Sequence, residues 1–107
     1  MSSSNQVFRA LADETRRTIL QLLRHGPLTS GEIAERFDSS WPTISRHLAV
    51  LRDAELVTTQ RRGQEIRYEL NTSVFQDVIQ HLIEWSRPTG GASRRLPRLV
   101  KTRQKEA

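Results

Sequence analysis

The sequence predicts a mainly α-helical α+β fold, in which four helices precede a small β-hairpin and a fifth helix follows it. Apolar residues recur at helical spacing before residue 54 and after residue 71. Between these regions, residues 56–60 and 65–70 read as two strands joined by a short link that contains Gly63, which is typical of a β-hairpin. The chain has 107 residues, so we expect one compact domain and a tail.

The first two helices are predicted over residues 5–11 and 14–24. Asp13 directly precedes the second helix, where its carboxylate can accept hydrogen bonds from the free backbone N–H groups of the first turn. Gly26 and the proline after it should end that helix. The first helix carries an apolar stripe of Val7, Phe8 and Leu11. The second helix has a face expected to be buried, formed by Ile19, Leu22 and Leu23.

The third and fourth helices are predicted over residues 30–36 and from the residue after Ser40. Thr29 and Glu32 have the spacing of a capping box, which satisfies two backbone N–H groups at a helix start. Pro42 falls in the first turn of the fourth helix, where a missing N–H costs nothing. The residues expected to face the core are Ile33, Ala34, Phe37, Ile44, Leu48 and Leu51.

The last helix begins after Asn71 and is apolar around more than one face. Its apolar residues are Val74, Phe75, Val78, Ile79, Leu82, Ile83 and Trp85. Such a helix needs a second surface to bury against, and in a short chain we expect that surface to be a second copy. The alternative is that the helix only covers the core of the monomer. The residues expected at a homodimer interface are Val7, Phe8, Leu11, Leu82, Ile83 and Trp85.

The basic charge of the chain is concentrated in its tail. The net charge is +5, and residues 87–107 carry seven basic residues against one acidic residue. Residues 1–86 therefore carry about −1, with ten basic and eleven acidic residues. We expect a folded domain over residues 1–86 and a disordered basic tail over 87–107. A basic chain suggests an anionic partner such as nucleic acid, but the folded part must be judged on its own geometry.

The order of elements α-α-α-α-β-β-α is that of a winged helix-turn-helix domain, in which the fourth helix enters the DNA major groove and the hairpin is the wing. Small polar groups and an arginine near the start of that helix suit contacts with bases and phosphates. The residues expected to contact double-stranded DNA are Ser39, Ser40, Trp41, Thr43, Ser45, Arg46, His47, Arg61 and Arg62.

Three of these contacts have competing interpretations. The indole of Trp41 either packs on the third helix or lies against DNA. His47 lies beside the apolar face, so it is either a half-buried packing residue or a phosphate contact. Arg61 and Arg62, expected at the hairpin tip, either enter or straddle a groove or serve only solubility.

Two stretches of the chain resemble the ArsR family of transcriptional regulators. Residues 8–20 are similar to its opening helices, and residues 41–51 with 54–57 to its recognition helix and the following strand. The run at 68–71 also fits, and the start and length of the last helix are most similar to the SdpR-type autorepressors. The resemblance implies a repressor that dimerises through its first and last helices. It also implies an inverted-repeat operator that overlaps the regulator's own promoter.

Some members of this family sense metals, either at a thiolate site in the third helix or at carboxylate and histidine ligands that both subunits contribute from the last helix. The family's thiolate site would fall near residues 33–38, but the chain has no cysteine. Asp77 and His81 share a helical face, yet two ligands are too few for a tetrahedral site unless a second subunit contributes two more. We therefore expect no metal and no other cofactor, with a solvated helix face as the simpler interpretation. No catalytic triad or phosphate loop is present, so an enzyme is not expected.

The sequence is also compatible with functions other than that of a DNA-binding repressor. Winged helices also bind proteins, and Trp41 would suit such a module, although the polar start of the fourth helix and the arginines of the hairpin favour DNA. An activator is a further alternative, and a partner protein could relieve repression by sequestering the regulator. No apolar stretch approaches the roughly 20 residues needed to span a membrane, and no secretory signal is evident, so we expect a cytoplasmic protein without membrane insertion.

Overall fold

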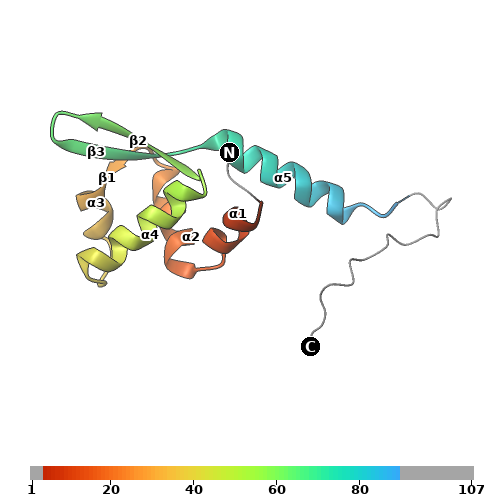
Figure 1. The fold of residues 1–107 in the computed structure, drawn as a ribbon, viewed down its shortest axis with the longest axis horizontal. Helices are drawn as coiled ribbons and strands as arrows, with labels where there is room; N and C mark the ends of the chain where they lie inside the picture. The colour runs from red at the N-terminus through yellow and green to blue at the C-terminus, as the bar shows by residue number, and fades with distance from the viewer. Residues whose placement is uncertain (1–3, 90–107) are drawn as a thin grey trace.

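The computed structural model describes residues 4–89 and confirms the predicted order of helices and hairpin (Figure 1). The tail prediction lies outside the described residues from residue 90 onward. The elements are α1 (Ser4–Leu11), α2 (Glu14–Leu23), β1 (Leu28–Thr29), α3 (Ser30–Ala34), α4 (Trp41–Asp53), β2 (Val57–Arg62), β3 (Glu65–Leu70) and α5 (Thr72–Ser86).

The predicted helix starts are confirmed by their caps. The carboxylate of Asp13 accepts a hydrogen bond from the backbone N–H of Arg16 at 3.0 Å. At α3 the capping box is complete, because Thr29 Oγ1 accepts from the N–H of Glu32 and the Glu32 carboxylate accepts from the N–H of Thr29. Ser40 caps α4 by accepting from the N–H of Thr43. Each cap satisfies an N–H group that has no partner within its helix.

The sheet contains one more strand than the sequence predicted. Its order is β1-β3-β2, and both pairings are antiparallel. Strand β1 has only two residues, and it pairs Leu28 with Tyr68 of β3. This strand places the start of α3 against the base of the hairpin.

The core lies between the helices and one face of the sheet, and it includes a residue predicted for the dimer interface. Val7 is only 3% exposed within one subunit, so it is a core residue and the prediction that it lies at the dimer interface is wrong. Because α1 lies against α2 and α4, the side of α1 that carries Val7 and Ala10 faces inward. The other buried apolar residues are Ile19, Leu20, Leu23, Ile33, Ile44, Leu48, Leu51, Ala54, Leu56, Val57 and Tyr68.

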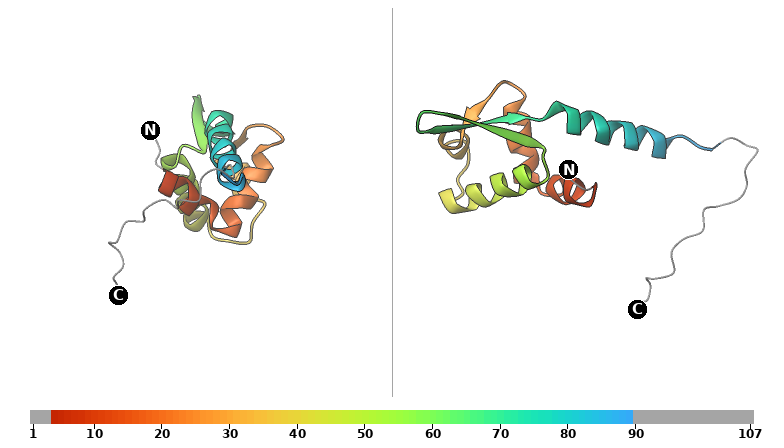
Figure 2. Two further views of the ribbon diagram at one scale, coloured as in Figure 1. Left: turned by 90° about the vertical axis from the view of Figure 1, so that its right-hand side faces the viewer. Right: turned by 45° about the horizontal axis from the view of Figure 1, so that its top comes forward.

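Helix α5 extends away from the body of the molecule. Figures 1 and 2 show it leaving the sheet on the side opposite the hairpin tip. Val74, Phe75 and Val78 in its first half pack partly against the core, but no residue of α5 is fully buried. Ile79, Leu82, Ile83 and Trp85 are exposed. We call residues 79–86 the arm.

Asn71 joins the base of this helix to the end of α4. Although it stands at the N-cap position of α5, its side chain makes no cap and instead donates from Nδ2 to the carbonyl oxygen of Glu55 at 2.9 Å. Its backbone N–H donates to the carbonyl oxygen of Leu56, also at 2.9 Å. Glu55 has a φ of 62°, a left-handed conformation that turns the chain from α4 into β2. These hydrogen bonds hold the C-terminal ends of α4 and β3 together.

Candidate nucleic-acid interface

The recognition helix α4 is anchored by one face and exposed on another. Ile44, Leu48 and Leu51 are at most 2% exposed and fix the helix to the core. Ser45 and Arg46 lie on the exposed side. Because the backbone of this helix is already fixed, little conformational entropy is lost when its polar side chains enter a groove.

Small hydroxyl groups surround the N-terminus of α4. Ser39 and Ser40 are exposed, and the hydroxyl groups of Ser40 and Thr43 lie 3.0 Å apart. Thr43 is half-buried, so its hydroxyl is oriented by Ser40 rather than free to rotate. The free N–H groups and positive dipole end of a helix start favour a phosphate at this position.

Trp41 lies beside the third helix and is also partly exposed. Its side chain lies near α3, because a Cβ placed on Gly31 would be 3.9 Å from Cη2 of Trp41. The residue is nevertheless 53% exposed. One edge of the indole therefore rests against α3 while the rest remains available to a partner.

His47 faces the second helix and is half-buried. Its Nδ1 lies 3.2 Å from Nη1 of Arg16 and 3.8 Å from Oδ2 of Asp13. Arg16 also donates to the carbonyl oxygens of Arg9 and Ala10, at 3.0 and 2.8 Å. This guanidinium therefore links the end of α1 to the recognition helix.

The wing differs from the prediction in its turn. Arg61 and Arg62 were expected in the link, but they are the last two residues of β2 and pair with Ile66 and Glu65. A two-residue turn suffices because Gly63 has a φ of 62°, which glycine adopts without strain. Since successive strand residues point to opposite faces, the two arginines project from opposite sides of the hairpin.

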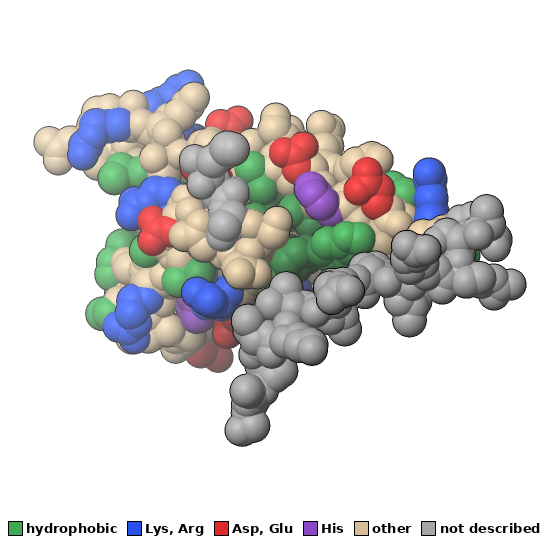
Figure 3. Space-filling view, turned by 45° about the vertical axis from the view of Figure 1, so that its right-hand side comes forward, with side chains coloured by type: hydrophobic (Ala, Val, Ile, Leu, Met, Phe, Trp, Pro, Cys, Tyr) green, Lys and Arg blue, Asp and Glu red, His purple; other side chains and the backbone are tan. Residues whose placement is uncertain are grey.

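The two candidate DNA-binding elements lie at one end of the molecule. Figures 1 and 2 show the hairpin tip and the N-terminus of α4 at the end opposite the arm. Figure 3 shows Lys and Arg side chains at the hairpin end, whereas acidic side chains and a histidine lie along the face near α5. Acidic side chains also occur at the hairpin end, where Glu65 lies 3.8 Å from Arg67, so the basic side chains there are partly neutralised.

Hydrogen bonds at two helix caps favour the ionised form of two acidic residues. The backbone N–H of Arg16 lowers the pKa of Asp13, and the charge of His47 when protonated acts in the same direction. The backbone N–H of Thr29 lowers the pKa of Glu32. In both cases the hydrogen bond favours the ionised carboxylate.

The possible metal ligands on α5 are not brought into a larger cluster. Nδ1 of His81 lies 2.8 Å from the carbonyl oxygen of Asp77, not from its carboxylate. Residues 4–89 contain no group of three or more histidine, cysteine or acidic side chains placed to hold a metal ion. Within the same residues, no helix is long and apolar enough to cross a membrane.

The fold and the exposed start of α4 define a winged-helix DNA-binding transcription regulator. Residues 13–59 match the family model described as "Bacterial regulatory protein, arsR family". The chain is 49% identical over 81 residues to the transcriptional repressor SdpR of Bacillus subtilis (strain 168), which covers 76% of this chain and 90% of that protein. The chain belongs to the ArsR family, and it is a regulator rather than an enzyme.

Two further relatives agree with this assignment. An arsenical resistance operon repressor of Staphylococcus aureus is 41% identical over 76 residues, which cover 71% of this chain and 73% of the relative. The solved structure of an ArsR-like transcriptional regulator from Rhodococcus sp. RHA1 superposes with a TM-score of 0.72 at 32% identity. That match covers 76% of this chain and 74% of the other.

Proposed function

We propose that this protein is a homodimeric repressor that binds an inverted-repeat operator overlapping its own promoter. The observation that carries the proposal is the exposed polar start of α4, held by a fully buried opposite face. The relatives named as repressors support the direction of regulation. Residues 1–86 form the DNA-binding and dimerisation domain in this proposal, and residues 87–107 add a basic tail.

The residues of the site divide into two roles. Arg46 lies in the second turn of α4, where a guanidinium can make a bidentate contact with guanine, and Ser45 adds a hydroxyl beside it. Ser39, Ser40 and Thr43 stand at the helix start and suit a phosphate. Trp41 contacts a sugar or a thymine methyl group with the exposed part of its indole.

The remaining basic residues provide affinity without reading bases. Arg61 and Arg62 project from the two faces of the hairpin end, and they contact phosphates on either side of a groove. His47 supports α4 from behind through Arg16. It therefore affects DNA binding through the position of the helix.

A two-fold dimer relates this site to a second one. Two recognition helices related by a two-fold axis read half-sites that are inverted repeats, about 34–36 Å apart when they lie one helical turn from each other. The exposed arm, at the opposite end from the DNA-binding elements, is the surface on which the second copy packs. A dimer bound across the promoter blocks transcription of the downstream gene.

Sequencing the DNA that purified protein retains from fragmented genomic DNA tests the proposal. We expect enrichment of an inverted repeat that includes the promoter of the protein's own gene, and lower reporter expression from that promoter in the presence of the protein. An Arg46→Ala variant serves as the control, because it should lose the enrichment while remaining folded. Failure to enrich any DNA would contradict the proposal, and higher reporter expression would identify an activator.

A further inference from the structure

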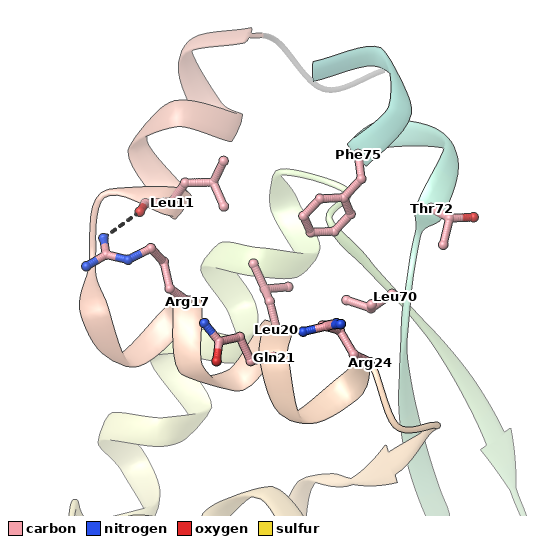
Figure 4. Close-up of a pocket in the computed structure, with 8 residues that line it drawn as sticks. All are labelled: Leu11, Arg17, Leu20, Gln21, Arg24, Leu70, Thr72 and Phe75. Carbon is pink, nitrogen blue, oxygen red and sulfur yellow. Dashed lines mark hydrogen bonds between the residues drawn. The ribbon is translucent and has the colours of Figure 1, made fainter. Parts of the chain in front are cut away.

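An apolar hollow lies where α2, the start of α5 and the ends of α1 and β3 meet (Figure 4). Its volume is about 360 Å³, which is at the lower end of the range of ligand-sized sites. The side chains of Leu20 and Phe75 approach it from opposite sides. The full lining is Leu11, Arg17, Leu20, Gln21, Arg24, Leu70, Thr72 and Phe75.

The rim of the hollow is positively charged. Arg17 lies in α2 and Arg24 is the C-cap residue of the same helix, and no acidic side chain of the described residues lines the hollow. Arg17 donates from Nη1 to the carbonyl oxygen of Leu11 at 2.9 Å. Within residues 4–89, the guanidinium of Arg24 has no hydrogen bond or ion pair. The hollow therefore suits an apolar occupant that carries a negative charge beside it.

The arm of α5 has those properties. Leu82 and Trp85 are 47% and 63% exposed. The helix carries Asp77 and Glu84 but no lysine or arginine. Glu84 has no side-chain hydrogen bond or ion pair within the described residues. The arm is thus apolar with one carboxylate, Glu84, whereas the hollow is apolar with two arginines at its rim.

Contacts within the chain already orient the indole of Trp85. Its ring centroid lies 5.8 Å from that of Phe8 and 6.1 Å from that of His81. Aromatic contacts at these distances are stabilising. Trp85 is therefore held by α1 on one side and open on the other, so little ordering is needed before it enters a partner.

Symmetry determines which part of a second copy meets the hollow. A two-fold axis perpendicular to α5 packs two copies of the helix antiparallel, and each contact then occurs twice. The last turn of one copy lies beside the first turn of the other. That first turn contains Thr72 and Phe75, which line the hollow. A parallel arrangement would place the two arms together and leave both hollows open.

We infer that, in the homodimer proposed above, the hollow of each subunit receives the partner subunit's Trp85. The partner's Glu84 then pairs with Arg24 at the rim. The inference rests on the proposed homodimer and names the site at which it closes. The arm of each subunit thus fills the hollow of the other subunit.

Charge reversal tests the contact at the rim. We expect Arg24→Glu and Glu84→Arg each to raise the dissociation constant of the dimer by about tenfold or more, as measured by sedimentation. The double variant restores both pairs of the symmetric dimer, and it should return within about threefold of the unaltered protein. Arg36→Glu, on an exposed residue away from the hollow, is the matched control and should leave the dissociation constant unchanged. Circular dichroism establishes that each variant is folded.

Fluorescence tests the position of the indole itself. A Trp41→Phe variant leaves Trp85 as the only tryptophan. Its emission should move to shorter wavelength over the concentration range in which sedimentation detects the dimer. A dimer that is insensitive to the reversals, is not restored in the double variant, or leaves Trp85 emission unchanged would overturn this inference but not the proposed homodimer. A monomer at all concentrations would overturn both.

Discussion

Nη1 of Arg16 lies 3.2 Å from Nδ1 of His47, which joins the start of α2 to the middle of the recognition helix. A guanidinium can only donate hydrogen bonds, so this contact is a hydrogen bond when His47 is neutral with its proton on Nε2 and Nδ1 accepts. The same guanidinium donates to two carbonyl oxygens near the end of α1. One side chain thus connects three helices.

Removal of the acceptor on His47 should destabilise this junction. His47→Leu leaves a guanidinium N–H without its partner, and it should lower the free energy of unfolding by about 1–3 kcal/mol in urea denaturation. His47→Gln supplies a carbonyl oxygen at a similar distance from the backbone and should lose less than half as much. Equal stability of the two variants would show that the contact contributes nothing.

The cap at α2 should give the protein a pH-dependent contribution at acidic pH. The pKa of Asp13 is lowered from 3.8 chiefly by the N–H of Arg16, so its contribution to stability is present above that value and is lost as the pH falls through the folded-state pKa. Asp13→Ala should cost about 0.5–2 kcal/mol at neutral pH. The difference from the unaltered protein should begin to shrink as the pH falls below about 4, and it should vanish only below the lowered folded-state pKa of Asp13. Asp13→Asn retains a cap at every pH, so it should weaken this pH dependence in urea titrations.

Arg46 should determine base preference. Arg46→Ala is expected to weaken operator binding by about 1–3 kcal/mol and to relax the preference at one base pair of each half-site. Arg46→Lys keeps the charge but not the bidentate geometry, so it should retain affinity for random DNA while losing the preference. Anisotropy titrations on operator and scrambled duplexes measure both quantities. An equal loss on both duplexes for Arg46→Ala would contradict the assignment.

The wing and the tail should act on all DNA sequences alike. Arg61→Ala and Arg62→Ala are each expected to lower affinity for operator and random DNA equally, and to reduce the slope of log affinity against log salt by about 1. Removal of residues 87–107, which carry a net charge of +6, should have the same signature with a larger slope change. A tail deletion that abolished operator preference would assign base reading to the tail.

Zinc should not regulate this protein. Because Asp77 offers its backbone carbonyl to His81 and the described residues hold no larger ligand cluster, neither added zinc nor a chelator should alter operator affinity. His81→Ala serves as a control and should behave identically in the same titrations. A tenfold change in affinity with stoichiometric zinc would refute the prediction.

Local signals in the sequence predicted the features that depend on local chemistry. The carboxylate of Asp13 and the pair Thr29 and Glu32 identify helix starts because their hydrogen bonds span only three residues. The core face of α4 follows from spacing alone, and Ile44, Leu48 and Leu51 are buried as predicted. The exposure of Arg46 follows from the same spacing.

Features that depend on distant partners were missed or misplaced. Strand β1 has two residues and exists because β3 pairs with it, so its own sequence carries no strand pattern. Val7 belongs to an apolar stripe, but the sequence does not state whether that stripe faces α2 and α4 or a second subunit. The hollow combines residues from α1, α2, β3 and α5, which no local pattern brings together.

The hydrogen bonds of Asn71 to Glu55 and Leu56 bear on the distance between the two half-sites of the operator. These hydrogen bonds join the start of α5 to the C-terminal end of the recognition helix α4. A change in the direction of the arm should therefore move the recognition helix with it. In the proposed dimer, the two recognition helices are consequently held at one fixed separation. An insertion of about five base pairs, half a turn of DNA, would carry the second half-site to the opposite side of the duplex. The second recognition helix could not reach it there.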